Sequence, residues 1–154
     1  MLFRSPLLVP SFTYEGVHNL HHARTRYGTV EDPEYLPLAL MKPWTLPVFL
    51  LVAVLMPVAM LIRFAILSPL SAVIPALRRE VVAKYSGLKI NPAFERRPPE
   101  GELKTQWFWQ ELGASLFSIA LLTLVATGVI PLRDFGIYLA VVAGVAVKIG
   151  RAHV

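Results

Sequence analysis

Two stretches of this chain contain no charged side chain, and each is about as long as a helix that crosses a lipid bilayer. They are residues 43–62 and 112–130, and a spanning helix needs about 20 mostly apolar residues. Only 16% of the residues are charged, whereas a soluble domain is about 25% charged. We therefore predict an all-α membrane protein. Fibrous, disordered and disulfide-stapled classes are excluded, and the lack of cysteine excludes thiol catalysis.

The second apolar stretch predicts a transmembrane helical hairpin. Residues 112–130 form its first arm, residues 131–134 a tight polar turn, and residues 135–147 the start of a second spanning helix. Trp107 and Trp109 come directly before the first arm. Aromatic side chains at such a place are typical of the membrane interface.

The first apolar region, residues 44–77, is predicted to form interfacial or re-entrant helices. The flanking segments 18–42 and 78–111 are both rich in Lys and Arg, so the positive-inside rule places both in the cytoplasm. Arg63 near the middle favours this arrangement, because a charge at the bilayer centre costs about 2.5–3.5 kcal/mol. The alternative is a full span over 44–62, which would place 78–111 outside.

The last seven residues, 148–154, read KIGRAHV. One back-translation of this string, AAG ATC GGA AGA GCA CAC GTC, contains the start of a common sequencing adapter. We expect the tail to be adapter read-through and the preceding sequence to be a fragment; a basic C-terminal tail is the alternative. Without Lys148 and Arg151 the formal charge falls from +5 to +3. This value fits a mildly basic membrane protein better than a nucleic-acid binder.

A histidine cluster carries the chemistry of this sequence. His18, His21 and His22 have the spacing HxxHH, and positions i, i+3 and i+4 share one face of a helix. Imidazole binds iron, zinc, copper and nickel, and neighbouring histidines suit two adjacent metal ions better than one. The alternatives are a surface cluster near lipid headgroups and a structural zinc site, which normally has four ligands.

The surroundings of the cluster resemble the membrane fatty acid desaturase family around its second histidine box. The resemblance rests on residues 9–37, which read VPSFTYEGVHNLHHARTRYGTVEDPEYLP, and on the INPAF loop at 90–94. The part YGTVEDPEYLP is similar to bacterial members. The resemblance extends over residues 6–147, because the proline-punctuated apolar region and the later hairpin fit the same layout.

The resemblance implies that His18, His21 and His22 bind two iron ions. It also implies an oxidoreductase that activates dioxygen and introduces a double bond into a fatty acyl chain. Electrons would come from a ferredoxin or a cytochrome b5-like donor. The implied location is the bacterial inner membrane, with the histidine-box helix on the cytoplasmic side.

The sequence departs from this family in one respect. The family has three histidine boxes, and the chain carries only the box at 18–22. We therefore expect a partial desaturase domain over residues 1–147 that is inactive as written. A related di-iron hydroxylase of acyl chains, carotenoids or alkanes is one alternative, and a non-catalytic membrane anchor or interaction protein is another. Segment 78–111 could dock an acidic electron carrier, although contact with anionic lipid is favoured.

Overall fold

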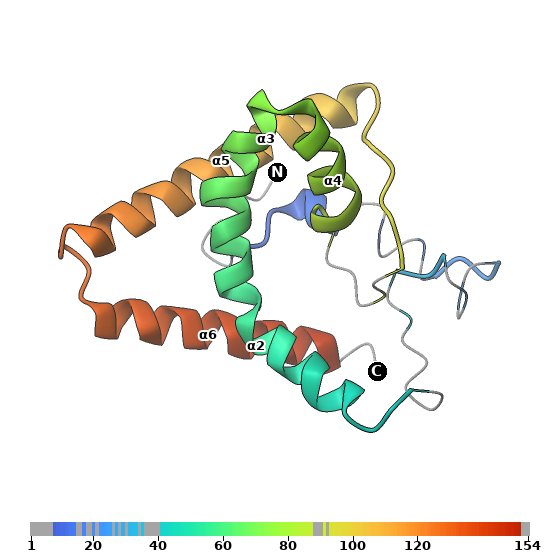
Figure 1. The fold of residues 1–154 in the computed structure, drawn as a ribbon, viewed down its shortest axis with the longest axis horizontal. Helices are drawn as coiled ribbons and strands as arrows, with labels where there is room; N and C mark the ends of the chain where they lie inside the picture. The colour runs from blue at the N-terminus through green and yellow to red at the C-terminus, as the bar shows by residue number, and fades with distance from the viewer. Residues whose placement is uncertain are drawn as a thin grey trace.

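The computed structural model describes most of the chain from residue 41 onward and part of the segment before it (Figure 1). The described residues are 8–14, 17, 20, 22–25, 27, 29, 31–33, 35, 41–87, 91 and 93–151, without the side chains of 146 and 148–151.

Helices make up every regular element of this described part. They are the 3-10 helix η2 (Ser11–Thr13), α2 (Thr45–Ile62), the π-helical turn η4 (Arg63–Leu67), α3 (Ser68–Val73), α4 (Pro75–Tyr85), α5 (Glu102–Ala126) and α6 (Leu132–Arg151). The prediction of an all-α fold is confirmed for these residues.

The first apolar region forms one continuous helical segment, Thr45–Val73, made of α2, η4 and α3. Pro57 lies inside α2, where its ring removes a backbone hydrogen bond and favours a bend. The segment is visibly bent in Figure 1. It ends where Ile74 takes an extended conformation, and Pro75 then occupies the first turn of α4, a position that tolerates proline.

Arg63 ends the charge-free run of the sequence but does not end the helix. The backbone continues through it as the π-helical turn η4. A helix can carry a charged residue through an apolar stretch when the head group finds partners inside the protein. The structure supplies such partners, as described below.

The second apolar region forms the predicted hairpin, with different boundaries. Helix α5 begins at residue 102, ten residues before the apolar stretch, and the turn lies between Ala126 and Leu132 rather than at 131–134. Gly128 has a φ of 77°, which glycine adopts readily and which ends α5. The backbone N–H of Asp134 donates to the carbonyl of Pro131 at 3.0 Å, so Asp134 already belongs to the first turn of α6, where its charge is favourable.

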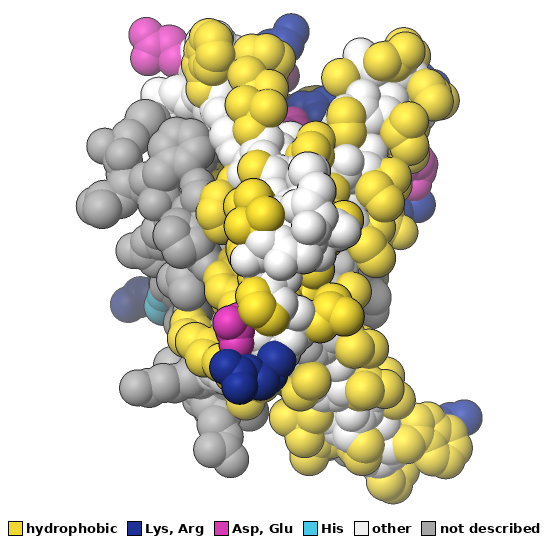
Figure 2. Space-filling model, turned by 90° about the vertical axis from the view of Figure 1, so that its left-hand side faces the viewer, with side chains coloured by type: hydrophobic (Ala, Val, Ile, Leu, Met, Phe, Trp, Pro, Cys, Tyr) yellow, Lys and Arg dark blue, Asp and Glu magenta, His cyan; other side chains and the backbone are white. Residues whose placement is uncertain are grey.

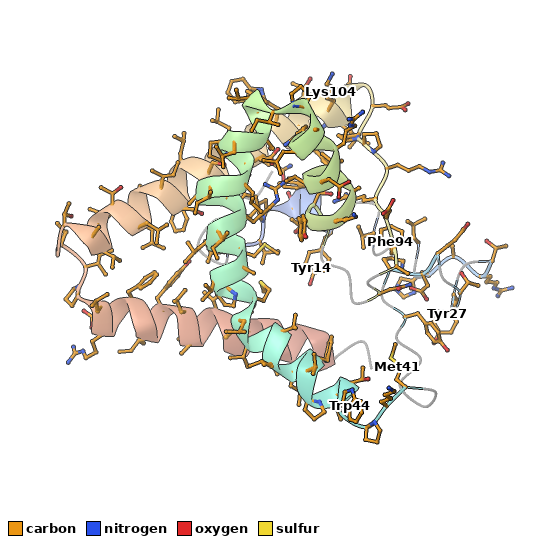
Figure 3. The ribbon with its side chains drawn as sticks, viewed as in Figure 1. Tyr14, Tyr27, Met41, Trp44, Phe94 and Lys104 are labelled. Atoms are coloured by element: carbon orange, nitrogen blue, oxygen red, sulfur yellow. The ribbon has the colours of Figure 1, made fainter. Side chains whose placement is uncertain are left out.

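The long segment Thr45–Val73 crosses the hairpin (Figure 1). Helix α2 contacts α6, and the turn η4 contacts α5. Figure 3 shows Trp44, at the start of α2, near the bottom of the view and Lys104, at the start of α5, near its top. A small aromatic core lies where η2, η4, α4 and α5 meet, and its buried members are Phe12, Phe64, Val82, Trp107 and Ala114.

The outer faces of the long helices are apolar and exposed. Thr45–Val73 and Glu102–Ala126 are each long and apolar enough to cross a membrane. Side chains such as Leu51, Leu116 and Ile137 are more than half exposed. Figure 2 shows hydrophobic side chains spread along the described helices on the face it presents, with few charges among them. An all-α chain with this surface is a membrane protein.

Candidate functional site

Two of the three predicted metal ligands, His18 and His21, lie outside the described residues. The third, His22, is described and its side chain is exposed. Within the described part no group of three His, Asp or Glu side chains could hold a metal ion. Imidazole is a ligand that suits iron, and the binding of two iron ions by these three histidines stays a prediction.

The described residues Val17 and Leu20 lie next to and inside the histidine box, residues 18–22. Val17 and Leu20 are helical, and Val17 is almost fully buried, with 1% of its surface exposed. Adding a Cβ atom at Gly87 would place it 3.2 Å from Cγ2 of Val17. The residue directly before His18 therefore packs against the chain just after α4.

The segment that leads into the box is anchored by an aromatic contact. Phe12 lies in η2 with 1% of its surface exposed. Its ring meets Phe64 edge-on, with ring centroids 6.3 Å apart, and Trp107 at 5.1 Å. Arg96 also contacts Trp107. Its guanidinium lies 4.0 Å from the centre of the Trp107 ring, which is a cation–π contact.

A pair of hydrogen bonds fixes the same segment on α5. The side-chain oxygen Oε1 of Gln110 accepts a bond from the Ser11 hydroxyl at 2.8 Å and another from the Phe12 backbone N–H at 2.9 Å. Gln110 is buried, so the bond from Phe12 is shielded from water, whereas the bond from the exposed Ser11 is partly shielded. They join parts of the chain that are 98 and 99 residues apart.

The neighbouring residue Glu111 is the centre of an ionic cluster, formed with the buried residues Arg63 and Ser68 and the partly exposed Arg78. Its Oε1 lies 2.7 Å from Nη2 of Arg63, and its Oε2 lies 2.6 Å from Nη1 of Arg78. The Ser68 hydroxyl also lies 3.1 Å from Oε1. Arg63 completes its contacts by donating from Nη1 to Ser68 and from Nε to the carbonyl of Tyr85 at 3.0 Å.

This cluster joins four elements: η4, α3, α4 and α5. A buried charge is tolerated only when partners satisfy it, and each carboxylate oxygen of Glu111 has an arginine partner. The sequence pattern singled out Arg63 but not Glu111 or Arg78. One sequence signal could have predicted the Arg63–Glu111 pair. Glu111 is an acidic residue directly before the apolar stretch at 112–130, and Arg63 is a basic residue inside the other apolar region.

The surface charges of segment 78–111 are more balanced than its Lys and Arg content suggests. Helix α4 carries an ion pair between Lys84 and Glu80 at 2.7 Å. The described exposed side chains of the segment are basic at Arg79, Lys84, Arg97 and Lys104 and acidic at Glu80, Glu95, Glu100 and Glu102. Docking of an acidic electron carrier here stays a prediction, and charge alone gives it little support.

The chain is similar to a ceramide hydroxylase of Caulobacter vibrioides. The two are 45% identical over 128 residues, which make up 83% of this chain and 36% of the hydroxylase. The chain thus spans about a third of its relative's length. No family model matches the chain, and no solved structure matches it.

The matched stretch contains the ionic cluster. Because it takes in 128 of the 154 residues, it includes residues 27–128 wherever it begins. Arg63, Arg78, Gln110 and Glu111 all lie inside that range. The hydroxylase therefore aligns with the part of this chain that holds the crossing helix, the cluster and most of α5.

Proposed function

We propose that this chain is a segment of a di-iron membrane hydroxylase that acts on ceramide or a closely related membrane lipid. The observation that carries the proposal is the 45% identity to the ceramide hydroxylase. Two further observations support it: the HxxHH cluster and the exposed apolar helices, which would place the enzyme in contact with its lipid substrate.

In this proposal His18, His21 and His22 supply part of the ligand set for two iron ions. The iron ions supply the activation of dioxygen that an unactivated C–H bond requires. In the overall reaction, one oxygen atom enters a C–H bond to give a hydroxyl group. The other leaves as water, using two electrons and two protons. The electrons would come from a ferredoxin or a cytochrome b5-like donor, and the remaining ligands from outside this segment.

The membrane setting follows from the same proposal. The apolar helices hold the chain in the bacterial inner membrane, and the histidine box faces the cytoplasm, where reduced electron carriers are available. The buried contacts of Phe12 and Val17 keep the segment before the box against the protein, which would help to exclude water from the metal site.

Desaturation is the second candidate reaction. It is favoured by the stretch YGTVEDPEYLP at residues 27–37, which resembles bacterial desaturases. The name of the relative favours hydroxylation instead. The two reactions differ in their products, because a hydroxylase adds one oxygen atom to the lipid and a desaturase removes two hydrogen atoms.

The complete protein, expressed in a bacterium that makes ceramide, tests the proposal by mass spectrometry of the lipids. We expect a hydroxylated lipid and iron in the purified protein. His21→Ala should remove both while membrane insertion is retained. Asn19→Ala, between the histidines, is the matched control and should keep both. Desaturated lipid would favour the second candidate, and full activity of His21→Ala would refute the ligand assignment.

A further inference from the structure

We propose that Gln110 and Gly87 are positioning residues for the histidine box. In the segment of residues 11–17, which directly precedes the first histidine, Gln110 binds residues 11 and 12 and Gly87 lies close to residue 17. This inference rests on the proposed function, because it assigns the segment the task of placing metal ligands. Neither residue would touch the metal or the substrate.

The first contact point is the side-chain oxygen of Gln110. It accepts bonds from the Ser11 hydroxyl and the Phe12 N–H at 2.8 and 2.9 Å. The bond from the backbone N–H fixes the main chain itself, independently of any side-chain motion. The Phe12 ring then fills the core beside Phe64 and Trp107. Residues 11 and 12 are thus fixed by both polar and apolar contacts.

The second contact point is the close approach of Val17 to Gly87. A Cβ atom at residue 87 would lie 3.2 Å from Cγ2 of Val17, which is shorter than carbon–carbon van der Waals contact. Gly87 follows α4, and its neighbour Ser86 accepts a bond at its carbonyl from Nη1 of Arg96 at 2.8 Å. Val17 therefore rests on a backbone that is itself held in place.

The two contact points belong to elements that the ionic cluster ties together. Gln110 precedes Glu111 on α5, and Glu111 binds Arg78 of α4. This ion pair therefore helps to fix the separation between the two contact points. A metal site needs its ligands held within about 0.5 Å of the productive geometry. The described residues 11, 12 and 17 have fixed contacts, and residue 17 directly precedes His18 in the sequence.

The first experiment measures the docking of the segment without using iron. The chain contains no cysteine, so Val17→Cys gives this segment a single buried thiol, and its labelling is followed on the peptide that contains residue 17. In the complete protein, Gln110→Met keeps the length of the side chain but removes the acceptor oxygen. We expect its thiol labelling by a maleimide to speed up by at least about tenfold, because the two bonds that Oε1 accepts are lost. Gln106→Met, one turn earlier on α5, should leave the rate unchanged.

The same variants, without the introduced cysteine, are then analysed for iron content. We expect Gln110→Met to lose at least half of the bound iron and Gln106→Met to keep it. Unchanged labelling or unchanged iron in Gln110→Met would overturn the positioning role. Wild-type protein that binds no iron would instead refute the proposed function, so the two failures are distinguishable.

A suppression experiment tests the second contact point. Gly87→Ala should lower the iron content, because its methyl group presses on Val17. Val17→Ala removes Cγ2, the atom in the contact, so the double variant should regain iron relative to Gly87→Ala alone. A Gly87→Ala protein with full iron content, or a double variant no better than the single one, would overturn the role of Gly87.

Discussion

Arg63 shows how a single charged side chain is accommodated inside an apolar helix. Its three guanidinium nitrogens reach Tyr85, Ser68 and Glu111, so each nitrogen has a partner inside the protein. Such a pair adds little to stability compared with apolar side chains of the same size, but removing one partner leaves an uncompensated buried charge. The cost of leaving a buried charge without its partner can be measured by substituting Glu111.

Glu111→Gln should destabilise the protein by about 3–5 kcal/mol, because it leaves two arginines facing each other without a carboxylate. The change keeps the size of the side chain, so packing is preserved. The measurement is denaturant unfolding in detergent micelles. Glu102→Gln, on the exposed first turn of α5, is the control and should stay within about 0.5 kcal/mol of wild type.

A double-mutant cycle separates this ionic effect from general damage. Arg63→Met alone leaves Glu111 with one arginine, and Arg63→Met combined with Glu111→Gln removes both charges. We expect the double variant to be less destabilised than the sum of the single variants, by about 1–3 kcal/mol. Strict additivity would show that Arg63 and Glu111 do not interact in the folded protein.

At the scale of one residue, the sequence predicted that Arg63 was exceptional but not how the fold accommodates it. Its carboxylate partner lies 48 residues further along the chain, beyond the reach of any local pattern. The histidines are the opposite case. Their spacing predicts a shared function by itself, and His18 and His21 lie outside the described residues, so that assignment stays a prediction.

Among the elements, the turn between α5 and α6 depends on one backbone conformation. Gly128 has a φ of 77°, and a Cβ atom added there would meet no other atom within 4 Å. A side chain at this position therefore meets a conformational cost rather than a clash. For an L-residue this region costs roughly 1–2 kcal/mol.

Gly128→Ala should therefore lower the free energy of unfolding by about 1 kcal/mol. Gly136→Ala is the control, because residue 136 is helical and its Cβ would also meet open space. There alanine should be neutral or stabilising by up to about 1 kcal/mol. Equal effects at the two positions would contradict a turn that depends on a positive φ.

Element boundaries were predicted less well than the elements themselves. The charge-free stretch at 112–130 marked only the apolar part of α5 and the turn after it. The helix begins at residue 102, because its first turns bury Trp107, Gln110 and Glu111 against the protein. The length of a charge-free stretch shows how much of a helix is apolar, not where its hydrogen-bonded backbone begins. Polar helical turns at the end of such a helix are therefore missed in the sequence.

At the scale of the whole molecule, the two long apolar helical segments Thr45–Val73 and Glu102–Ala126 cross instead of running side by side (Figure 1). They cannot both stand along the membrane normal, so at least one is strongly tilted. The sequence prediction that 44–77 is interfacial or re-entrant is compatible with this arrangement. Composition predicted the all-α membrane class correctly, whereas the crossing depends on contacts between distant residues.

Substituted cysteines can establish the topology in intact membrane vesicles. With an interfacial or re-entrant Thr45–Val73, thiols introduced by Lys42→Cys and Arg79→Cys should react with an impermeant reagent from the same side. Val129→Cys, in the hairpin turn, should react from the opposite side, because α5 spans. Labelling of residues 42 and 79 from opposite sides would show a single full span over 44–62.

The ionic cluster also has a consequence for the order in which the helices enter the membrane during synthesis. When Thr45–Val73 leaves the ribosome, the carboxylate that Arg63 needs has not yet been synthesised, since it follows 48 residues later. An arginine alone costs about 2.5–3.5 kcal/mol at the membrane centre. The earlier helix should therefore wait beside the insertion machinery until α5 arrives, and the two should enter the lipid together as one unit.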